Sequence, residues 1–518
     1  MAKKITAALI TLLALSTFFK SISLAADDPS RRQIRGQEMG RDARLAGAIG
    51  QRVLRIGLVD CIAYALKNNS EIKIKRIDPK LKNDDVKIAK TVFEPDFNAE
   101  FSWHDNTVAS ANVLEGADTF NSKDANLNAG VSGKLPTGTR YAVDFYNQKY
   151  QSDSVFQEIN PYYAVEPKIT ITQPLFKNFG TVINRADIVL AKNYSLESEE
   201  SFKDKVMDII SRAKSAYYDY VFSLQAQAIA RAALSRAQEL LAINKARYAK
   251  GLVSSVELLE TEAAASDKEK SVIFAEYEVA KTQDNLKLVT NLIDDPDVWN
   301  ARIELLDKPD FSVEKVDLVE CLKNAFVYRP DYSIAKIDLK NRDIKIIQAK
   351  NNLFPQLDLI GSFGLNGLGE DYGAAIGKMN PDYQDWSAGF KFSIPWGGAD
   401  RAKLDQKKLE KAQALMAFKK LEDDIILEVR DKVRRMDTGY RQVLTSRISR
   451  RKEAENYSAQ KERYAVGQVS THDLLDYQDN LSSAELDYVR SVIAYKISLI
   501  NLEKSEGMTL VKNDIKLE

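Results

Sequence analysis

Cysteine and histidine are nearly absent from this sequence. Its 518 residues include two cysteines, Cys61 and Cys321, and two histidines. A disulfide framework or a structural zinc site needs more of these residues, so both are excluded. We predict that the two cysteines are small buried hydrophobic residues rather than a disulfide or a metal pair, and we expect no cofactor.

An excess of one charge is also missing. Lys and Arg number 74, and so do Asp and Glu. Nucleic-acid binding requires a basic surface, so the composition gives no support for a nucleic-acid partner. Charged residues make up 29% of the chain and the mean hydropathy is −0.33. No stretch beyond the N-terminus has 18 consecutive apolar residues, so no transmembrane helix is expected there.

The N-terminus has the pattern of a secretory signal. Lys3 and Lys4 precede an apolar run, and the small residues of "SLA" at 23–25 suit a cleavage site. The apolar run is short and is followed by Lys20, so a membrane anchor is the less favoured alternative. We therefore predict an exported protein, and any membrane insertion would have to be through strands.

The rest of the chain is a duplication. "LVDCIAYALKNNSEIK" at Leu58 matches "LVECLKNAFVYRPDYS" at Leu318, an offset of 260 residues. "ITQPLF" then matches "FSIPWG" at an offset of 221. "RYAKGLVSSVELLE" at Arg247 matches "RYAVGQVSTHDLLD" at Arg463, at an offset of 216. The halves share one plan. Because the offset falls from 260 to 221, the first half contains about 39 additional residues before "ITQPLF".

Each half predicts the same order of elements. A helix of about 40 residues begins near Leu58 or Leu318, a strand region follows, and a very long helix and a helix of about 35 residues complete the half. Period-2 alternation marks the strands, as in "FNAEFSWH" and "SAGFKFSI". Apolar residues at alternating spacings of three and four predict a coiled-coil seam along each long helix: Val206, Ile210, Ala213, Tyr217, Val221 and Leu224, and Ile426, Val429, Val433, Met436, Tyr440 and Val443.

The strand sections favour a membrane channel over a plain helical bundle. A surface coiled-coil or adhesin-like envelope protein remains the alternative, but it would not explain why strands interrupt both halves at the same point. One chain offers too few strands to close a barrel. An open sheet edge in lipid costs several kcal/mol for each unpaired group, so several chains would have to share one barrel.

The chain resembles the TolC-like outer-membrane efflux proteins over nearly its whole mature length. The resemblance rests on the two matched segments at Leu58 and Leu318, on "FEPDF" and "LFPQLDL", on "QPLFKNFG", and on the paired "RY-x-x-G" phrases. It implies a homotrimer with a shared β-barrel in the outer membrane and a long α-helical barrel in the periplasm of a Gram-negative cell. It also implies export in a tripartite efflux or type I secretion system, with a periplasmic adaptor protein and an inner-membrane transporter. The segment "NLNAGVSGKLPTGTRYAVDFYNQKY" departs from the pattern, as an extra hairpin inside or outside the barrel.

These inferences give the following organisation. The fold class is mixed α and β, a duplicated chain with long antiparallel coiled-coil helices and strands in a shared trimeric outer-membrane barrel. The predicted segments are a signal peptide (1–25), an N-terminal lead segment (26–55), a first repeat (56–300, with strands at about 97–173 and long helices at about 182–292), a second repeat (301–507, with strands at about 357–393 and long helices at about 402–507) and a C-terminal tail (508–518).

The repeated phrase predicts a U-turn between two helices. Gly251 and Gly467 suit the left-handed residue that ends a helix, and Ser254 and Ser470 can cap the next one. Acids three residues after each serine complete a capping box. Most of the phrase is therefore expected to serve helix termination and capping.

The remaining residues of the phrase are candidates for a periplasmic gate. Asp473 and Asp476 share a helix face, as do Glu257 and Glu260, and rings of carboxylates make cation-selective constrictions. The resemblance implies that Asp473 and Asp476 are the acids of the periplasmic entrance and that Tyr464 is a gate tyrosine. Val469 stands where the resemblance implies an arginine.

The turns themselves are candidate contacts for an adaptor protein. The resemblance implies docking at Lys250, Gly251 and Leu252 and at Val466, Gly467 and Gln468. Enzymatic motifs such as G-x-S-x-G, a P-loop or H-E-x-x-H are missing from the sequence, so we expect a passive duct and no enzyme.

Overall fold

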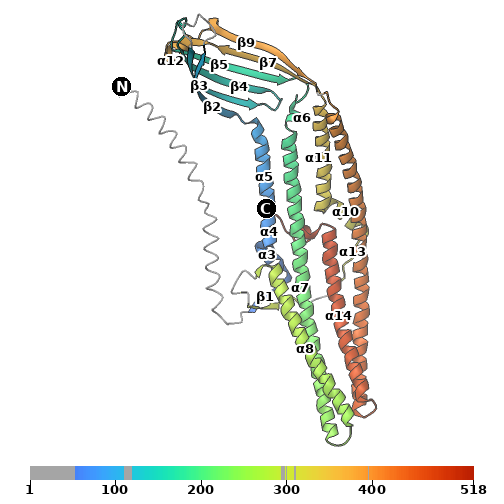
Figure 1. Ribbon diagram of the computed structural model, residues 1–518. Coiled ribbons are helices and arrows are strands. Elements are labelled where there is room, and N and C mark those ends of the chain that lie inside the picture. The colour runs from blue at the N-terminus through green and yellow to red at the C-terminus, as the bar shows by residue number, and fades with distance from the viewer. Residues whose placement is uncertain are drawn as a thin grey trace, which may run out of the picture.

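The protein is an elongated layer of helices with a sheet at one end (Figure 1). The computed structural model describes residues 53–109, 119–292, 298, 300–307, 311–394 and 396–517. The predicted signal peptide and all but the last three residues of the lead segment lie outside them. From the sheet, long helices run to two turns at the opposite end.

The two halves repeat one order of elements. The first half contains α3 (Leu58–Asn68), α4 (Ser70–Lys75), α5 (Ile77–Lys90), the 3-10 helix Thr91–Phe93, β2 (Asp96–Ala109), β3 (Thr119–Lys134), β4 (Arg140–Ser152), β5 (Tyr162–Pro174), α6 (Thr181–Asn184), α7 (Ala186–Tyr248) and α8 (Ser255–Val289). The second half contains α10 (Leu318–Tyr328), α11 (Pro330–Asn352), β7 (Gln356–Leu365), β8 (Gly367–Gly369), α12 (Tyr372–Gly377), the 3-10 helix Pro381–Tyr383, β9 (Gln384–Ser393), α13 (Ala399–Ala465), α14 (Thr471–Ser505) and α15 (Thr509–Lys512). These bounds agree closely with the predicted strand and long-helix regions.

The predicted helix of about 40 residues at the start of each half is divided. In the first half α3 ends before Asn69, whose side chain accepts hydrogen bonds from the backbone nitrogens of Glu71 (2.9 Å) and Ile72 (3.3 Å) and so begins α4. In the second half Pro330 is the first residue of α11, where its lack of an N–H costs nothing. The break occurs at the same place in both halves because each sequence supplies a helix start there.

The helices form a single layer with two free sides. Near the sheet the neighbours are α5, α7, α11 and α13, in that order, and farther away they are α8, α7, α14 and α13. One side of the layer is therefore α5 and α8, and the other is α13 along its whole length. The 63 residues of α7 make a rod of about 95 Å at 1.5 Å per residue. No helix in the described part of the chain is long and apolar enough to cross a membrane.

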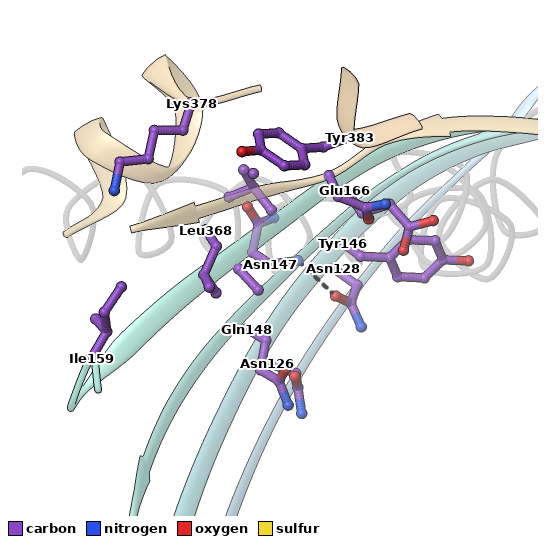
Figure 2. Close-up of a pocket in the computed structure, with 14 residues that line it drawn as sticks. Asn126, Asn128, Tyr146, Asn147, Gln148, Ile159, Glu166, Leu368, Lys378 and Tyr383 are labelled. Atoms are coloured by element: carbon purple, nitrogen blue, oxygen red, sulfur yellow. Dashed lines mark hydrogen bonds between the residues drawn. The ribbon is translucent and has the colours of Figure 1, made fainter. Parts of the chain in front are cut away.

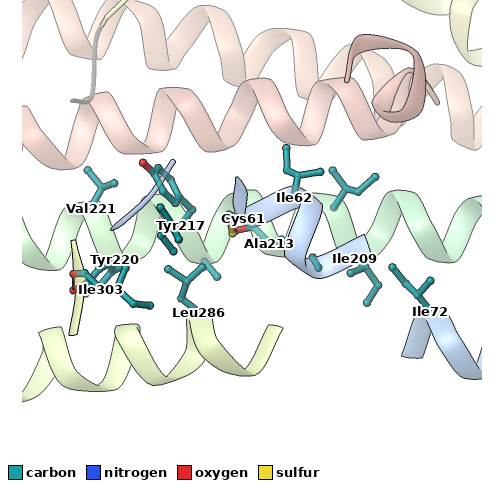
Figure 3. Packing of buried hydrophobic residues seen from close by; sticks show 14 of the residues in the cluster. Cys61, Ile62, Ile72, Ile209, Ala213, Tyr217, Tyr220, Val221, Leu286 and Ile303 are labelled. Atoms are coloured by element: carbon teal, nitrogen blue, oxygen red, sulfur yellow. Dashed lines mark hydrogen bonds between the residues drawn. The ribbon is translucent and has the colours of Figure 1, made fainter. Parts of the chain in front are cut away.

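The largest core lies at mid-height of this layer (Figure 3). Tyr217, Tyr220 and Ile209 of α7 pack with Cys61 of α3 and Leu286 of α8. Beside them β1 (Val53–Ile56) pairs in parallel with β6 (Arg302–Leu305), so the end of the predicted lead segment is joined to the link between the two halves. The core thus fastens the start of each repeat to the middle of the long helices.

The predicted apolar seams are largely confirmed. All of the first-half seam residues are buried except Leu224, which is half-buried. In the second half Val429, Met436 and Val443 are buried, but Ile425 is the fully buried residue at the start of the seam and Ile426 is only half-buried. Helices α10 and α14 both approach α13 in this region, so the buried stripe is set by two neighbours rather than by one straight coiled-coil partner.

The strands form one antiparallel sheet in which both halves take part. The order is β2-β3-β4-β5-β7-β9, and β8 continues alongside β5. The additional hairpin of the first half is therefore β3 and β4, and it lies within the sheet between β2 and β5. Strands β2 and β9 are the two edges.

The sheet has one apolar face and one polar face. Residues of the apolar face follow the ladder across all six strands and are exposed in the single chain: Phe97, Phe101, Trp103, Leu127, Val131, Val143, Ile169, Ile171, Leu359, Phe363, Trp386, Phe390 and Phe392. On the other face, Lys168 contacts Glu166 (3.0 Å) and Asp385 (2.9 Å), and the hydroxyls of Ser362 and Ser387 are 2.8 Å apart. A strong alternation of this kind suits a sheet with lipid on one side and water on the other.

Candidate functional site

Two matching turns form the end of the helical layer farthest from the sheet. Gly251 and Gly467 have φ values of 69° and 78°, which only glycine adopts cheaply. The amide of Leu252 donates to the carbonyl of Arg247 (2.9 Å), and that of Gln468 donates to the carbonyl of Arg463 (3.0 Å). These bonds close the helix ends in the Schellman pattern. The predicted helix stops are confirmed in both copies.

Both predicted serine caps are also present. The Ser254 hydroxyl accepts from the amide of Glu257 (3.2 Å), and the Ser470 hydroxyl accepts from the amide of Asp473 (3.1 Å). The Asp473 carboxylate accepts a hydrogen bond of 2.7 Å from the Ser470 hydroxyl itself. Asp473 is thus held in the first turn of α14, where a negative charge also suits the helix dipole.

The other predicted gate acids have different surroundings. Asp476 is exposed, and its carboxylate lies 3.8 Å from Nε2 of His472. Glu257 and Glu260 are half-buried. Asp473 and Asp476 therefore lie one helical turn apart near the tip of α14, one held in the cap and the other free to extend. Whether they face a pore depends on neighbouring copies, so their gate role stays a prediction.

Tyr464 does not extend into solvent but lies between the two helical hairpins. Its side chain is 4% exposed, and its hydroxyl is hydrogen-bonded to Oδ1 of Asn244 on α7. The same hydroxyl is 3.2 Å from the Thr471 hydroxyl, and the Asn244 amide donates to Thr471 (3.2 Å). Together these three side chains form a buried polar contact between α7, α13 and α14.

Arg247 completes this contact from the first half of the chain. Its guanidinium lies 4.6 Å from the centre of the Tyr464 ring, and it donates to the backbone carbonyls of Tyr464 and Ala465, both at 3.3 Å. We call Asn244, Arg247, Tyr464 and Thr471 the tip latch. Sequence reasoning did not single out Asn244, Arg247 or Thr471, although Arg247 begins the repeated phrase.

The contact between the two hairpins near the tips is small and mostly polar. Its apolar part consists of Leu240, Tyr464 and Leu474, with partly buried neighbours. Around it lie cross-hairpin ion pairs between Lys461 and Glu239 (2.8 Å) and between Lys268 and Asp479 (2.6 Å). Exposed pairs of this kind contribute at most about 1 kcal/mol. The hairpins can therefore separate at the tips without opening the large core at mid-height.

The predicted adaptor-contact residues are all exposed. Lys250, Gly251 and Leu252 lie at the first tip, and Val466, Gly467 and Gln468 lie at the second. Leu252 and Val466, at corresponding positions beside the two glycines, are 70% and 71% exposed. Each tip thus presents one apolar side chain to solvent.

The described residues offer little material for metal or redox chemistry. They contain no group of three or more His, Cys, Asp or Glu side chains placed to hold a metal ion. Cys61 and Cys321 are free and buried, as predicted. Burial raises the pKa of both thiols to about 12, so they stay protonated and unreactive at neutral pH.

Comparison with known proteins identifies the family. The family described as "Outer membrane efflux protein" matches residues 61–292 and 321–508, one segment in each half. No curated protein sequence matches the chain.

Several solved outer-membrane channels share the fold. CmeC of Campylobacter jejuni is 17% identical, with 87% of this chain and 86% of that chain covered and a TM-score of 0.63. MtrE of Neisseria gonorrhoeae, crystallised in its open state, is 18% identical (88% and 89% covered, TM-score 0.61). VceC of Vibrio cholerae is 14% identical (87% and 96% covered, TM-score 0.64). The chain belongs to the outer membrane efflux protein family, and it is an outer-membrane channel of a Gram-negative cell that extends into the periplasm.

Proposed function

We propose that three copies of this chain form a passive export duct that works with a periplasmic adaptor and an inner-membrane transporter, in a tripartite efflux or type I secretion system. The observation that carries this proposal is the open architecture of the single chain, whose helical layer and sheet both end in free edges. The duct itself performs no chemistry, and the transporter supplies the energy. Its other partner is outer-membrane lipid.

The free sides of the helical layer support assembly with further copies. Large apolar side chains are exposed on α13 (Leu409, Met416, Leu427 and Ile448) and on the opposite side of the layer (Leu81 and Ile88 of α5, and Ile273, Phe274 and Tyr277 of α8). Apolar surface of this extent indicates a protein contact. A head-to-tail arrangement brings α13 of one copy against α5 and α8 of the next and closes a ring.

The sheet supports the same arrangement. Strands β2 and β9 are at its edges, and their apolar faces include Phe97, Phe101, Trp386 and Phe390, all exposed. In lipid an unpaired strand edge costs several kcal/mol for each unsatisfied backbone group. Pairing of β2 of one copy with β9 of the next removes both edges. The resemblance to TolC-like proteins supports three copies.

The tips support the roles of gate and docking surface. The tip latch holds the two hairpins of one copy together, and its release would let them separate and widen the periplasmic entrance. The exposed Leu252 and Val466 offer apolar contacts to an adaptor that meets the tips end-on. A substrate delivered by the transporter would then pass the tips, the helical tunnel and the barrel in turn.

The proposal is tested on the full-length protein purified from outer membranes in detergent and reconstituted in planar bilayers. We expect a mass of three chains, ion-conducting channels, and co-purification of an adaptor that Leu252→Asp together with Val466→Asp abolishes. A monomer without conductance, or fractionation to the inner membrane, would disprove the duct. Retained adaptor binding in the double variant would move docking away from the tips.

The acidic residues near the second tip give a separate prediction. If three copies place Asp473 and Asp476 around the entrance, the Asp473→Asn/Asp476→Asn variant should lose most of the block of single-channel current by multivalent cations. Asn keeps the size of Asp and its capping ability, so the helix start is preserved. The matched control is Glu257→Gln/Glu260→Gln in the first tip. Unchanged block in the Asp variant would leave these residues with a capping role alone.

A further inference from the structure

The additional hairpin of the first half lies at the centre of the sheet. Strand β3 pairs with β2 from Asp96↔Ser132 to Ala109↔Thr119, and β4 pairs with β5 from Arg140↔Thr172 to Tyr150↔Tyr162. Both strands, of 16 and 13 residues, exceed the 9–11 residues that cross a bilayer. Removing the hairpin from the sheet would leave β2 without a partner. It is therefore an integral part of the sheet rather than an appended loop.

The hairpin carries the same two faces as its neighbours. Its apolar residues Leu127, Val131 and Val143 are exposed in the single chain, and the ladder places Val131 opposite Phe97 and Val143 opposite Ile169. The apolar band therefore continues across β3 and β4 at the height it has in β2 and β5. Soluble loops have no reason to match this band.

The opposite face of the hairpin is polar. A Cβ added at Gly130 would meet Oδ1 of Asp144 at 2.2 Å and Oδ1 of Asn98 at 3.0 Å, which places these two side chains on one face. Farther along the strands, Asn126, Asn128 and Gln148 line a pocket of about 710 Å³ together with Lys378 and Tyr383 of the connection before β9 (Figure 2). Polar side chains on this face suit a water-filled interior.

The width of six strands matches the width of the helical layer. With strands about 4.8 Å apart and tilted by about 40°, six strands cover about 38 Å of a barrel's circumference and four cover about 25 Å. Near the sheet each copy has four helices side by side, and these cover about 36–40 Å at roughly 9–10 Å spacing. Six strands thus continue the helical wall without narrowing it.

We propose that β3 and β4 span the outer membrane, so that three copies close a barrel of eighteen strands. This inference rests on the trimeric duct proposed above. Such a barrel has a diameter of about 36 Å, or about 26 Å inside the side chains, whereas twelve strands leave about 14 Å. An α-helix with its side chains is about 10–12 Å wide. The outer-membrane end therefore admits polypeptide cargo that keeps a helical hairpin, as well as small solutes.

Thiol labelling of the trimer in proteoliposomes tests the position of the hairpin. Adjacent positions on opposite faces give matched pairs: Val131→Cys with Ser132→Cys on β3, Val143→Cys with Asp144→Cys on β4, and Ile169→Cys with Thr170→Cys on β5 as the reference. The native cysteines are buried, so the introduced thiol is the one that reacts. We expect a bimane label at 131 and 143 to be quenched by nitroxide lipids, and 132 and 144 to react with a charged methanethiosulfonate.

The reference strand separates the two ways in which the result can be negative. Quenching at 169 without quenching at 131 and 143 would put the hairpin outside the bilayer and overturn the inference while the duct stands. Absence of quenching at all three positions would contradict the membrane-embedded sheet itself. For the width, polyethylene glycol of about 20 Å hydrodynamic diameter, added on the extracellular side, should lower the conductance. Exclusion of all polymers wider than about 14 Å would overturn the wide barrel.

Discussion

Replacing Tyr464 by phenylalanine should increase the open probability and mean conductance of the reconstituted channel. The hydroxyl of Tyr464 links Asn244 on α7 to Thr471 on α14 inside a buried contact. Its removal deletes hydrogen bonds worth about 0.5–1.5 kcal/mol each and leaves the Asn244 carbonyl oxygen without this donor. A loss of about 1–3 kcal/mol in each copy shifts closure by roughly 5- to 150-fold per copy, since 1.4 kcal/mol is a factor of ten.

The repeat supplies a matched control for this substitution. Tyr248 occupies the corresponding position at the first tip but is 46% exposed, whereas Tyr464 is 4% exposed. Tyr248→Phe should therefore leave the conductance unchanged. Arg247→Ala, which removes the stacked guanidinium and its two backbone hydrogen bonds, should open the channel as Tyr464→Phe does.

A double substitution examines whether the latch acts as a unit. Because Tyr464 and Asn244 share one hydrogen bond, Tyr464→Phe/Asn244→Ala should open the channel less than the sum of the two single changes. Equal conductance of the wild type and the Tyr464→Phe trimer would refute the latch as a closing contact.

The second large effect is expected at mid-height, where Lys214→Ala should destabilise the fold by about 3–5 kcal/mol. Lys214 of α7 contacts both carboxylate oxygens of Glu503 of α14, at 3.0 and 3.1 Å. The two side chains are 8% and 13% exposed. Removal of the lysine leaves a buried carboxylate with the Asn513 amide as its remaining donor, at 2.7 Å, and this lone charge is the source of the loss.

The midpoint of guanidinium unfolding in detergent, followed by helix content, measures this loss. Lys245 lies on the same helix α7, but its pair with Glu262 is 56% and 43% exposed, so Lys245→Ala should cost less than about 1 kcal/mol. Lys214→Met together with Glu503→Leu should recover much of the stability, because it removes both charges and fills the space. If Lys214→Ala unfolded at the same midpoint as Lys245→Ala, the ion pair would be solvated rather than buried.

Local patterns were enough to predict the plan of this molecule. The periods of 3.6 and 2 in the sequence depend on neighbouring residues alone, so the long helices and the strand regions follow from it directly. The glycine stops at Gly251 and Gly467 and the serine caps are equally local, since a left-handed residue and a hydroxyl acceptor act within one turn. The duplication then gave the order of the elements twice.

The break after α3 and α10 shows a limit of the same reasoning. Continuous apolar spacing favoured one helix, but Asn69 and Pro330 each begin a new helix. Both residue types are known helix starters, so the signal was present in the sequence and was outweighed by the periodicity.

By itself, the sequence determined the repeated hairpins of rods, the strand sections and the two turns, because each depends on chemistry within a few residues. The tertiary structure alone decided how the two copies differ. Arg247-Tyr248 and Arg463-Tyr464 are the same dipeptide, yet Tyr464 lies against α7 and Tyr248 lies at the free side of the layer, so one is part of the latch and the other is exposed. In the same way β3 and β4 join the centre of the sheet because β2 and β5 flank them, and burial between elements distant in the chain cannot be read from a local pattern.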